Sequence, residues 1–271
     1  MKKYFIILAV VVFGCFLINS CQKSADVKLS NDQQVSTQFS LGCNLLPAAE
    51  YAKIPVAKEI AGIPLKTVVN LACPPVANQG QSNCIGWGTA YAARSILWHR
   101  DHVAPYSPSV NIFCPYFVNY YSGVCTGGAY VSSALGVLYN RGVCRLSIGT
   151  TSDCAVPTAA QNADALIYRI NSFGTVTRST AAIKAQLNAG FPVIVAGPVN
   201  NAFLYYTSGV LSTFSGSSLG GHCYCIVGYD DTKSAFKFMN SWGTSWGSAG
   251  FGWIKYGYET TWWSEAYVMG N

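Results

Sequence analysis

Cys84, the last residue of the stretch NQGQSNC (78–84), is placed for nucleophilic chemistry. Gly80 puts a turn ahead of it, and the Ala-rich sequence that continues to about His99 predicts a helix that begins at the cysteine. The unpaired N–H groups and the dipole at the start of a helix favour the thiolate form of a cysteine. The alternative is that Cys84 is one of eleven cysteines in the chain and merely follows a turn.

A thiol nucleophile also needs a base, and the chain has three histidines. His99 and His102 fall near the end of the helix predicted from Cys84, roughly 22 Å away at the rise of an α-helix, and cannot reach the thiol. We expect both to be charged or capping residues at a helix C-terminus. His222 lies between SLGG and an apolar strand and is the remaining candidate, although a satisfied surface histidine would also fit there.

Composition limits the classes of function. Hydrophobic residues make up 51% of the 271 residues and charged residues only 10%, which favours a secreted protein with a sizeable core. The formal net charge is +6, but the basic residues are scattered singly, so nucleic-acid binding is unsupported. The cysteine and histidine spacings form no zinc motif, and we expect neither a metal nor another cofactor.

The N-terminus predicts export. Lys2 and Lys3 precede an uncharged apolar run, residues 4–18, which is too short to span a membrane and is typical of a signal peptide. The run ends in LINSC, which resembles a bacterial lipobox and predicts a signal peptide over residues 1–20 with lipidation of Cys21. We therefore expect a lipoprotein of the bacterial cell envelope, periplasmic or at the surface. The alternative is ordinary signal cleavage nearby and a secreted protein.

Export makes disulfides possible, since they persist in oxidising compartments. Cys15 lies in the predicted signal, Cys21 is the lipidation candidate and Cys84 the nucleophile candidate. Eight cysteines remain, enough for up to four bridges of undetermined connectivity: Cys43, Cys73, Cys114, Cys125, Cys144, Cys154, Cys223 and Cys225. The last two are two apart in a strand-like run, so they share a face, and buried free thiols are an alternative for them.

The chain divides into a tether and extended segment, residues 21–64, and a domain, residues 65–271. The first half of the domain predicts helices over 84–99, over 107–121 with Pro115 ending or kinking it, and over 130–142. The second half predicts a helix over 181–190 and strands over 192–199, 222–230, 235–242, 250–256 and 265–270. Helices followed by strands indicate an α+β fold of two lobes, with a cleft between them as the expected site.

Three stretches together resemble the papain family of cysteine peptidases: NQGQSNCIGWGTAYA (78–92), GGHCYCIVGYDD (220–231) and NSWGTSWGSAGFGWI (240–254). Their order agrees, and His222 and Asn240 follow Cys84 by 138 and 156 residues. The resemblance spans residues 65–271. It implies a papain-like fold with a helical N-terminal lobe, an antiparallel β-rich C-terminal lobe and an active-site cleft between them.

The resemblance also implies roles. Cys84 would attack a peptide carbonyl as a thiolate paired with the His222 imidazolium, which would then protonate the leaving amine. Asn240 would orient the imidazole, and Trp242 would shield that hydrogen bond or simply pack in the core. The Cys84 backbone N–H and the Gln79 side-chain amide would form the oxyanion hole.

Other implied features lie in CTGGAYVSSALGVL (125–138), which resembles the family's Gly-Gly block. Gly127 and Gly128 would let a substrate backbone approach for strand-like pairing, or form an ordinary turn. Cys114–Cys154 resembles a family disulfide. Cys125 lacks its usual partner, and Cys144 is a plausible substitute.

The chain departs from the family pattern around the nucleophile. Gln79 and Cys84 are five apart rather than six, no cysteine stands three residues before Cys84, and Asn83 replaces a small residue. We expect Gly80 to let Gln79 reach the oxyanion position; failing that, either the donor is lost or Gln81 takes over. The long inhibitory helical propeptide of plant and animal members does not fit in residues 22–64.

These features predict an exported, lipid-anchored, monomeric cysteine endopeptidase that acts on peptides or proteins. Two alternatives stay open. One is a papain-fold binding lipoprotein that has lost catalysis. The other is a transpeptidase or self-processing enzyme that uses the same acyl-enzyme.

Overall fold

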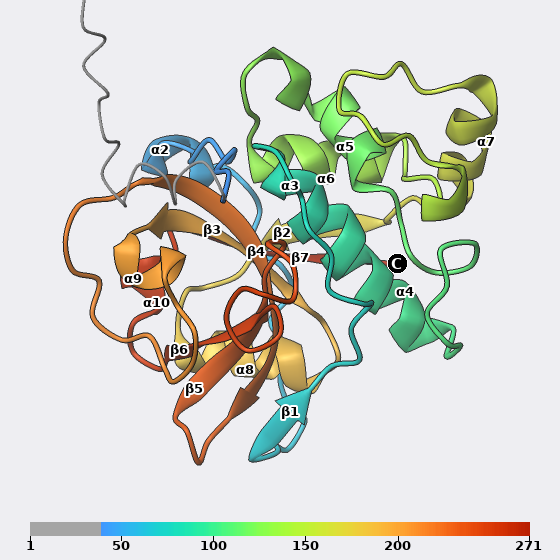
Figure 1. The fold of residues 1–271 in the computed structure, drawn as a ribbon. Coiled ribbons are helices and arrows are strands. Elements are labelled where there is room, and N and C mark those ends of the chain that lie inside the picture. The colour runs from blue at the N-terminus through green and yellow to red at the C-terminus, as the bar shows by residue number, and fades with distance from the viewer. Residues whose placement is uncertain (1–38) are drawn as a thin grey trace, which may run out of the picture.

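The computed structural model describes residues 39–271, and it has a helical lobe packed beside an antiparallel sheet (Figure 1). The predicted α+β, two-lobed fold is confirmed. The helical elements are α2 (Ala48–Tyr51), α3 (Cys84–Gly86), a π-helix (Trp87–Arg94), α4 (Ser95–Asp101), α5 (Pro115–Ser122), a 3₁₀ turn η2 (Val124–Thr126), α6 (Val131–Asn140), a 3₁₀ turn η3 (Leu146–Ile148), α7 (Ala159–Ile167), α8 (Thr180–Asn188), α9 (Asn201–Leu204) and α10 (Glu259–Trp262). The strands are β1 (Val68–Asn70), β2 (Ser172–Thr175), β3 (Val193–Val199), β4 (Gly220–Asp230), β5 (Ala235–Met239), β6 (Phe251–Lys255) and β7 (Glu265–Gly270).

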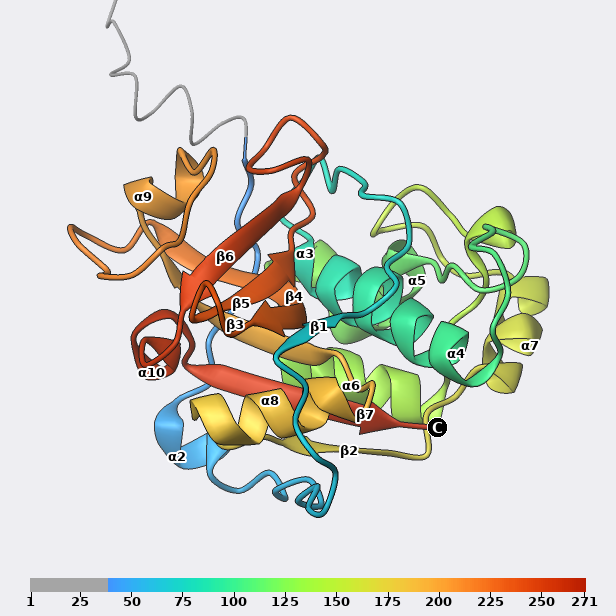
Figure 2. The same ribbon diagram turned by 90° about the horizontal axis from the view of Figure 1, so that it is seen from below.

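A continuous helical segment runs from α3 through the π-helix to α4, between strand β4 on one side and helices α5 and α6 on the other (Figure 2). Two glycines allow this close packing. A Cβ on Gly86 would lie 2.3 Å from the Pro115 carbonyl oxygen, and one on Gly88 would lie 2.7 Å from Cys223 Sγ. The segment therefore holds Cys84, its first residue, between the two lobes.

The structure corrects the prediction for Pro115. Helix α5 begins at this proline instead of ending or bending there. The first helical position suits proline because its missing N–H would have no partner inside the helix.

The sheet has the order β2-β7-β3-β4-β5-β6, with β1 also paired to β4, and every strand pair is antiparallel. Cys223 and Cys225 both point into the core shared with the helices, whereas Tyr224 and Ile226 point into the core on the other face. The prediction that the two cysteines share a face is confirmed.

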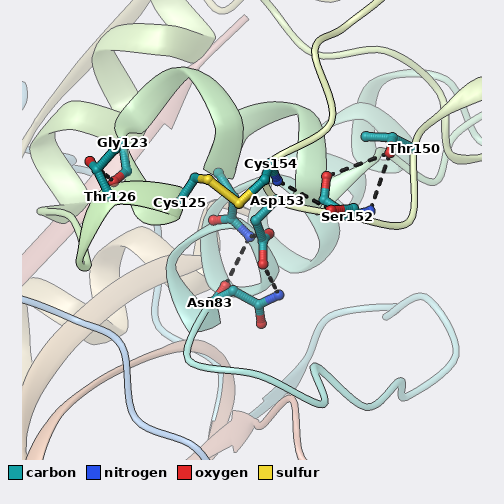
Figure 3. Close-up of a disulfide and its surroundings, with 9 residues drawn as sticks. Asn83, Gly123, Cys125, Thr126, Thr150, Ser152, Asp153 and Cys154 are labelled. Carbon is teal, nitrogen blue, oxygen red and sulfur yellow. Dashed lines mark hydrogen bonds between the residues drawn. A yellow bond between two sulfur atoms is a disulfide. The ribbon is translucent and has the colours of Figure 1, made fainter.

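A disulfide between Cys125 and Cys154 joins η2 to the loop before α7, across a Cα separation of 5.2 Å (Figure 3). The predicted pairings Cys114–Cys154 and Cys125–Cys144 are therefore wrong. Cys114 and Cys144 instead lie opposite each other beside an isolated antiparallel bridge, where the Cys114 N–H donates to the Cys144 carbonyl at 2.9 Å.

Residues 39–64 lie against the domain. The Tyr51 hydroxyl donates to the Ala266 carbonyl at 3.0 Å and accepts from the Ala266 N–H at 3.0 Å, which fixes α2 on strand β7. The predicted signal peptide and Cys21 lie outside the described residues. Within residues 39–271, the helices are all too short or too polar to cross a bilayer.

Candidate active site

Cys84 is the first residue of α3 and is fully buried. The backbone N–H groups of Cys223, on strand β4, and of Gly42, near the start of the described residues, lie close enough to its Sγ to favour the thiolate. The predicted position at a helix start is thus observed, and the thiol touches both the sheet and a segment that the sequence did not connect with it.

His222 lies on β4, opposite Gly197 of β3, and is fully buried. Its Nε2 is 2.8 Å from Asn240 Oδ1, which also accepts the Ser241 N–H at 2.8 Å. Because that oxygen can only accept, Nε2 carries the imidazole proton. Nδ1 makes no hydrogen bond within residues 39–271 and is left as the basic nitrogen.

Trp242 covers this pair. Its ring stacks on the His222 imidazole with centroids 4.5 Å apart, and it is 1% exposed. Phe39 stacks in turn on Trp242, with centroids 4.9 Å apart. The shielding and the core-packing interpretations of Trp242 both fit this arrangement.

Gln79 is buried beside the same loop. Its Oε1 accepts the Ser241 hydroxyl at 2.6 Å, and its Nε2 donates to the Ser40 carbonyl at 2.8 Å and to the Gln81 carbonyl at 2.6 Å. Gly80 has φ +69°, so the turn uses the conformational freedom that only glycine supplies cheaply. The amide that we expected at an oxyanion hole therefore holds a peptide carbonyl oxygen.

The N-terminal segment, defined here as residues 39–46, occupies the space between the lobes. The Cys43 N–H donates to the Gly221 carbonyl at 3.3 Å, and the Asn44 N–H donates to the Ala129 carbonyl at 2.9 Å. The Leu46 N–H donates to Glu265 Oε1 at 2.6 Å. The segment thus bridges the sheet lobe and the helical lobe directly over Cys84.

Gly127 and Gly128, with φ +127° and +85°, line the groove beside this segment. The strand-like pairing is made one residue later, by Ala129, which forms a parallel bridge with Cys43. Sequence reasoning missed Ala129, because its backbone carbonyl, not its side chain, makes the contact.

Burial changes the ionisation of the Cys84 thiol and of the His222 imidazole. It raises the pKa of Cys84 from 9.0 to about 11, although backbone N–H donors oppose the rise. It also lowers the pKa of His222 from 6.5 to about 4, although the bond to Asn240 opposes the fall. At pH 7 this form therefore holds a neutral thiol and a neutral imidazole.

The other two histidines lie where the sequence placed them. His102 follows the last residue of α4, and its ring nitrogen Nδ1 lies 3.1 Å from the Trp98 carbonyl oxygen. His99 stacks on Tyr106. Both belong to the end of α4 and neither takes part in the site.

The described residues contain no group of three His, Cys, Asp or Glu side chains that could hold a metal ion. The polar groups close to Cys84 Sγ are backbone N–H groups, those of Cys223 and Gly42.

A sequence model of the papain family of cysteine proteases matches residues 67–269. The chain belongs to this family. The papain-family match includes Cys84, His222 and Asn240 in one domain.

Individual relatives are distant. Gamete and mating-type specific protein A of Dictyostelium discoideum is 27% identical over 183 residues, which cover 65% of this chain and 39% of that protein. Cathepsin B-like cysteine proteinase 4 of Caenorhabditis elegans is 27% identical over 148 residues, or 48% of this chain and 44% of that protein. The papain-family chain therefore spans less than half the length of these relatives.

Solved structures support the papain-like fold. Xylellain, a cysteine protease from Xylella fastidiosa, superposes with a TM-score of 0.74 at 22% identity, over 86% of this chain and 96% of that one. Procathepsin B S9 from Trypanosoma congolense gives a TM-score of 0.70 at 16% identity, over 88% of this chain and 89% of that one. At these identities the similarity establishes the fold alone.

Proposed function

We propose that this papain-family chain is a cysteine endopeptidase in which Cys84 is the nucleophile, His222 the acid and base, and Asn240 the residue that orients His222. The observation that carries the proposal is the hydrogen bond from His222 Nε2 to Asn240 Oδ1, which leaves Nδ1 unprotonated and without a partner in residues 39–271. A base in this tautomer can take the proton of a nearby thiol.

The chemistry follows from these groups. The Cys84 thiol gives its proton to His222 Nδ1, and Sγ attacks the peptide carbonyl carbon to form a tetrahedral oxyanion. As this intermediate collapses, the C–N bond breaks and Nδ1–H protonates the leaving amine, so that a thioester remains on Cys84. Water then attacks the thioester while His222 accepts its proton, and the acid product and the free thiol are released.

Gln79 is proposed as an oxyanion donor. Its buried Nε2 binds the Ser40 carbonyl oxygen, which is the kind of atom that becomes the oxyanion in a substrate. Removing one such donor typically lowers the rate by about 10²–10³. The bond from Ser241 to Gln79 Oε1 would hold the amide in the required direction.

The path of residues 39–46 supports an endopeptidase. The segment runs past Cys84, from the stacking contact of Phe39 on Trp242 to the bond between Leu46 and Glu265. A groove that accepts chain on both sides of the nucleophile suits cleavage inside a polypeptide. We propose peptides or unfolded proteins as substrates, and an exported, lipid-anchored location as the sequence predicts.

This form of the chain is closed to substrate. The Gly42 N–H lies close to Cys84 Sγ, and the thiol is fully buried, so the segment covers the nucleophile. Turnover requires residues 39–46 to leave the groove.

The proposal is tested by comparing the hydrolysis of an unfolded protein by the full chain with its hydrolysis by the Cys84→Ala variant. The unchanged chain should cleave internal bonds and be inactivated by a thiol-directed epoxide, whereas Cys84→Ala should do neither. Cys73→Ala removes a half-buried free thiol elsewhere and should keep the activity. Cleavage that survives in Cys84→Ala would refute the proposal. An epoxide-reactive Cys84 in a chain without hydrolysis would favour a binding protein.

A further inference from the structure

The carboxylate of Asp153 is bound to two buried amides that contact the residues around Cys84 (Figure 3). Its Oδ2 accepts from Asn83 Nδ2 at 2.8 Å, and its Oδ1 accepts from Asn119 Nδ2 at 2.9 Å. Asp153 is 6% exposed, and both amides are fully buried. The ion pairs among residues 39–271 do not include Asp153, so these amides replace a cation as its partners.

These bonds change how the helix that begins at Cys84 is capped. The side chain before a helix usually accepts an N–H of the first turn, but Asn83 makes no such bond. Instead Asn119, from α5, accepts the Gly86 N–H on its Oδ1 at 2.8 Å, and its Nδ2 also donates to the Asn83 carbonyl at 3.1 Å. The cap of the first turn is therefore supplied by another helix.

Asp153 determines which way the Asn83 amide faces and reinforces the orientation that the Gly86 N–H and the Asn83 carbonyl give to Asn119. A carboxylate can only accept, so Asn83 and Asn119 must each turn their NH₂ group toward it. For Asn119 this agrees with its other two bonds, which direct its oxygen at the Gly86 N–H. If Asp153 became an amide, it could accept from one NH₂ group but would present its own NH₂ group to the other.

The carboxylate is also fixed covalently. The next residue, Cys154, forms the disulfide with Cys125, and Cys125 lies next to the loop of Gly127 and Gly128. No cysteine stands three residues before Cys84, where the family pattern has one. The bond between Asn83 and Asp153 thus ties the residue before Cys84 to the disulfide that this chain does contain.

We propose that Asp153 is a positioning residue for Cys84, which acts through Asn83 and Asn119 to hold the thiol in place relative to His222. This inference rests on the proposed role of Cys84 as the nucleophile. Asp153 touches neither substrate nor thiol, so its loss should lower kcat more than it changes KM. A nucleophile displaced by about 1 Å can lose on the order of 100-fold in rate.

A double-mutant cycle tests the route through Asn83. Asp153→Asn, Asn83→Ala and the double variant are made in the full chain. The first readout is the rate at which iodoacetamide alkylates Cys84 at pH 7, with the site located by peptide mass spectrometry. The second is kcat and KM for peptide hydrolysis. Each single change should slow both reactions of Cys84 by at least 10-fold, and the double variant should be no slower than the slower single one.

Asp164→Asn is the matched control, because it removes a buried carboxylate of the same lobe that pairs with Arg145 and does not contact the loop before Cys84. This control should lower the unfolding midpoint and keep the alkylation rate of Cys84 within two-fold of that in the unchanged chain. If the effects of Asp153→Asn and Asn83→Ala simply add, or if Asp153→Asn acts like the control, the inference is wrong. If Asp153→Asn does not fold, Asn83→Ala alone must still slow Cys84 at least 10-fold. Absence of hydrolysis in the unchanged chain would count against the proposed function only, because alkylation needs no peptidase activity.

Discussion

A single methyl group at Gly42 should open the groove over Cys84. A Cβ added there would lie 1.9 Å from the Ser82 carbonyl oxygen and 2.2 Å from its carbon. The first contact is about 1 Å shorter than the 3.0 Å below which Cβ contacts essentially do not occur. Both partners are backbone, so Gly42→Ala cannot be accommodated by a side-chain rotation. The segment 39–46 must move away from Ser82.

The expected size of the effect follows from the burial of the thiol. In the closed form burial holds the pKa of Cys84 at about 11, against 9.0 for an ordinary cysteine. Returning the thiol to water lowers the pKa by about 2 units, which is about 2.7 kcal/mol or a 100-fold larger thiolate fraction at pH 7. Since the thiolate is the nucleophile, the reaction of Cys84 with a small electrophile should accelerate by about the same factor.

Alkylation by iodoacetamide at pH 7, resolved for each cysteine by mass spectrometry, measures this rate. Gly136→Ala is the matched control, because a Cβ on this α6 residue would meet no atom within 4 Å. The control should alkylate Cys84 like the unchanged chain. Hydrogen exchange of residues 39–46 should increase in Gly42→Ala and stay constant in the control.

A Gly42→Ala chain that keeps its fold but alkylates Cys84 within three-fold of the unchanged chain would refute the reasoning. In that case the segment would not limit access to the thiol. Faster alkylation of Cys43 or Cys223 alone would refute it equally, because Cys43 belongs to the segment and Cys223 is buried close to it.

Three further predictions concern stability. Replacing Cys125 and Cys154 by serine should lower the free energy of unfolding by roughly 3.5 kcal/mol in a denaturant titration, since the cysteines are 29 residues apart. The pKa of His222 is about 4 in the folded chain and 6.5 ordinarily, so the unfolded state binds the proton more tightly. Stability should therefore fall by about 3 kcal/mol as the pH drops from 6.5 to 4, and thermal unfolding of His222→Gln across this range should lack that loss. Phe236→Ala, in the core away from Cys84, should cost about 3–5 kcal/mol by the same titration and leave the alkylation rate unchanged.

The sequence predicted the elements that carry Cys84 and His222 because their signals are local. The helix from Cys84 has buried Ala90, Ala93 and Leu97 on its core side, and in β4 His222 is followed by a buried run without charged residues, 223–229. Hydrophobic pattern alone is enough to place such elements. Helix α7 was missed, although Thr158 and Gln161 form a capping box that the sequence displays as T-x-x-Q.

The remaining features depend on contacts that no local pattern encodes. Spacing does not fix disulfide connectivity, and the four cysteines of the helical lobe were paired wrongly for this reason. Ala129 acts through a backbone carbonyl, so its side chain carries no signal. Asp153 looks like an ordinary loop residue in the sequence, and only its burial against Asn83 and Asn119 distinguishes it.

Opening the groove should leave the groups around Cys84 assembled. The bond between His222 and Asn240 lies within the sheet lobe, and the start of α3 is held by Asn119 and β4, so neither depends on residues 39–46. The segment itself cannot diffuse away, because Tyr51 fixes the chain just after it to β7. A tethered segment competes with substrate at an effective concentration in the mM range. Peptides should therefore show a higher apparent KM with the unchanged chain than with Gly42→Ala, at the same kcat.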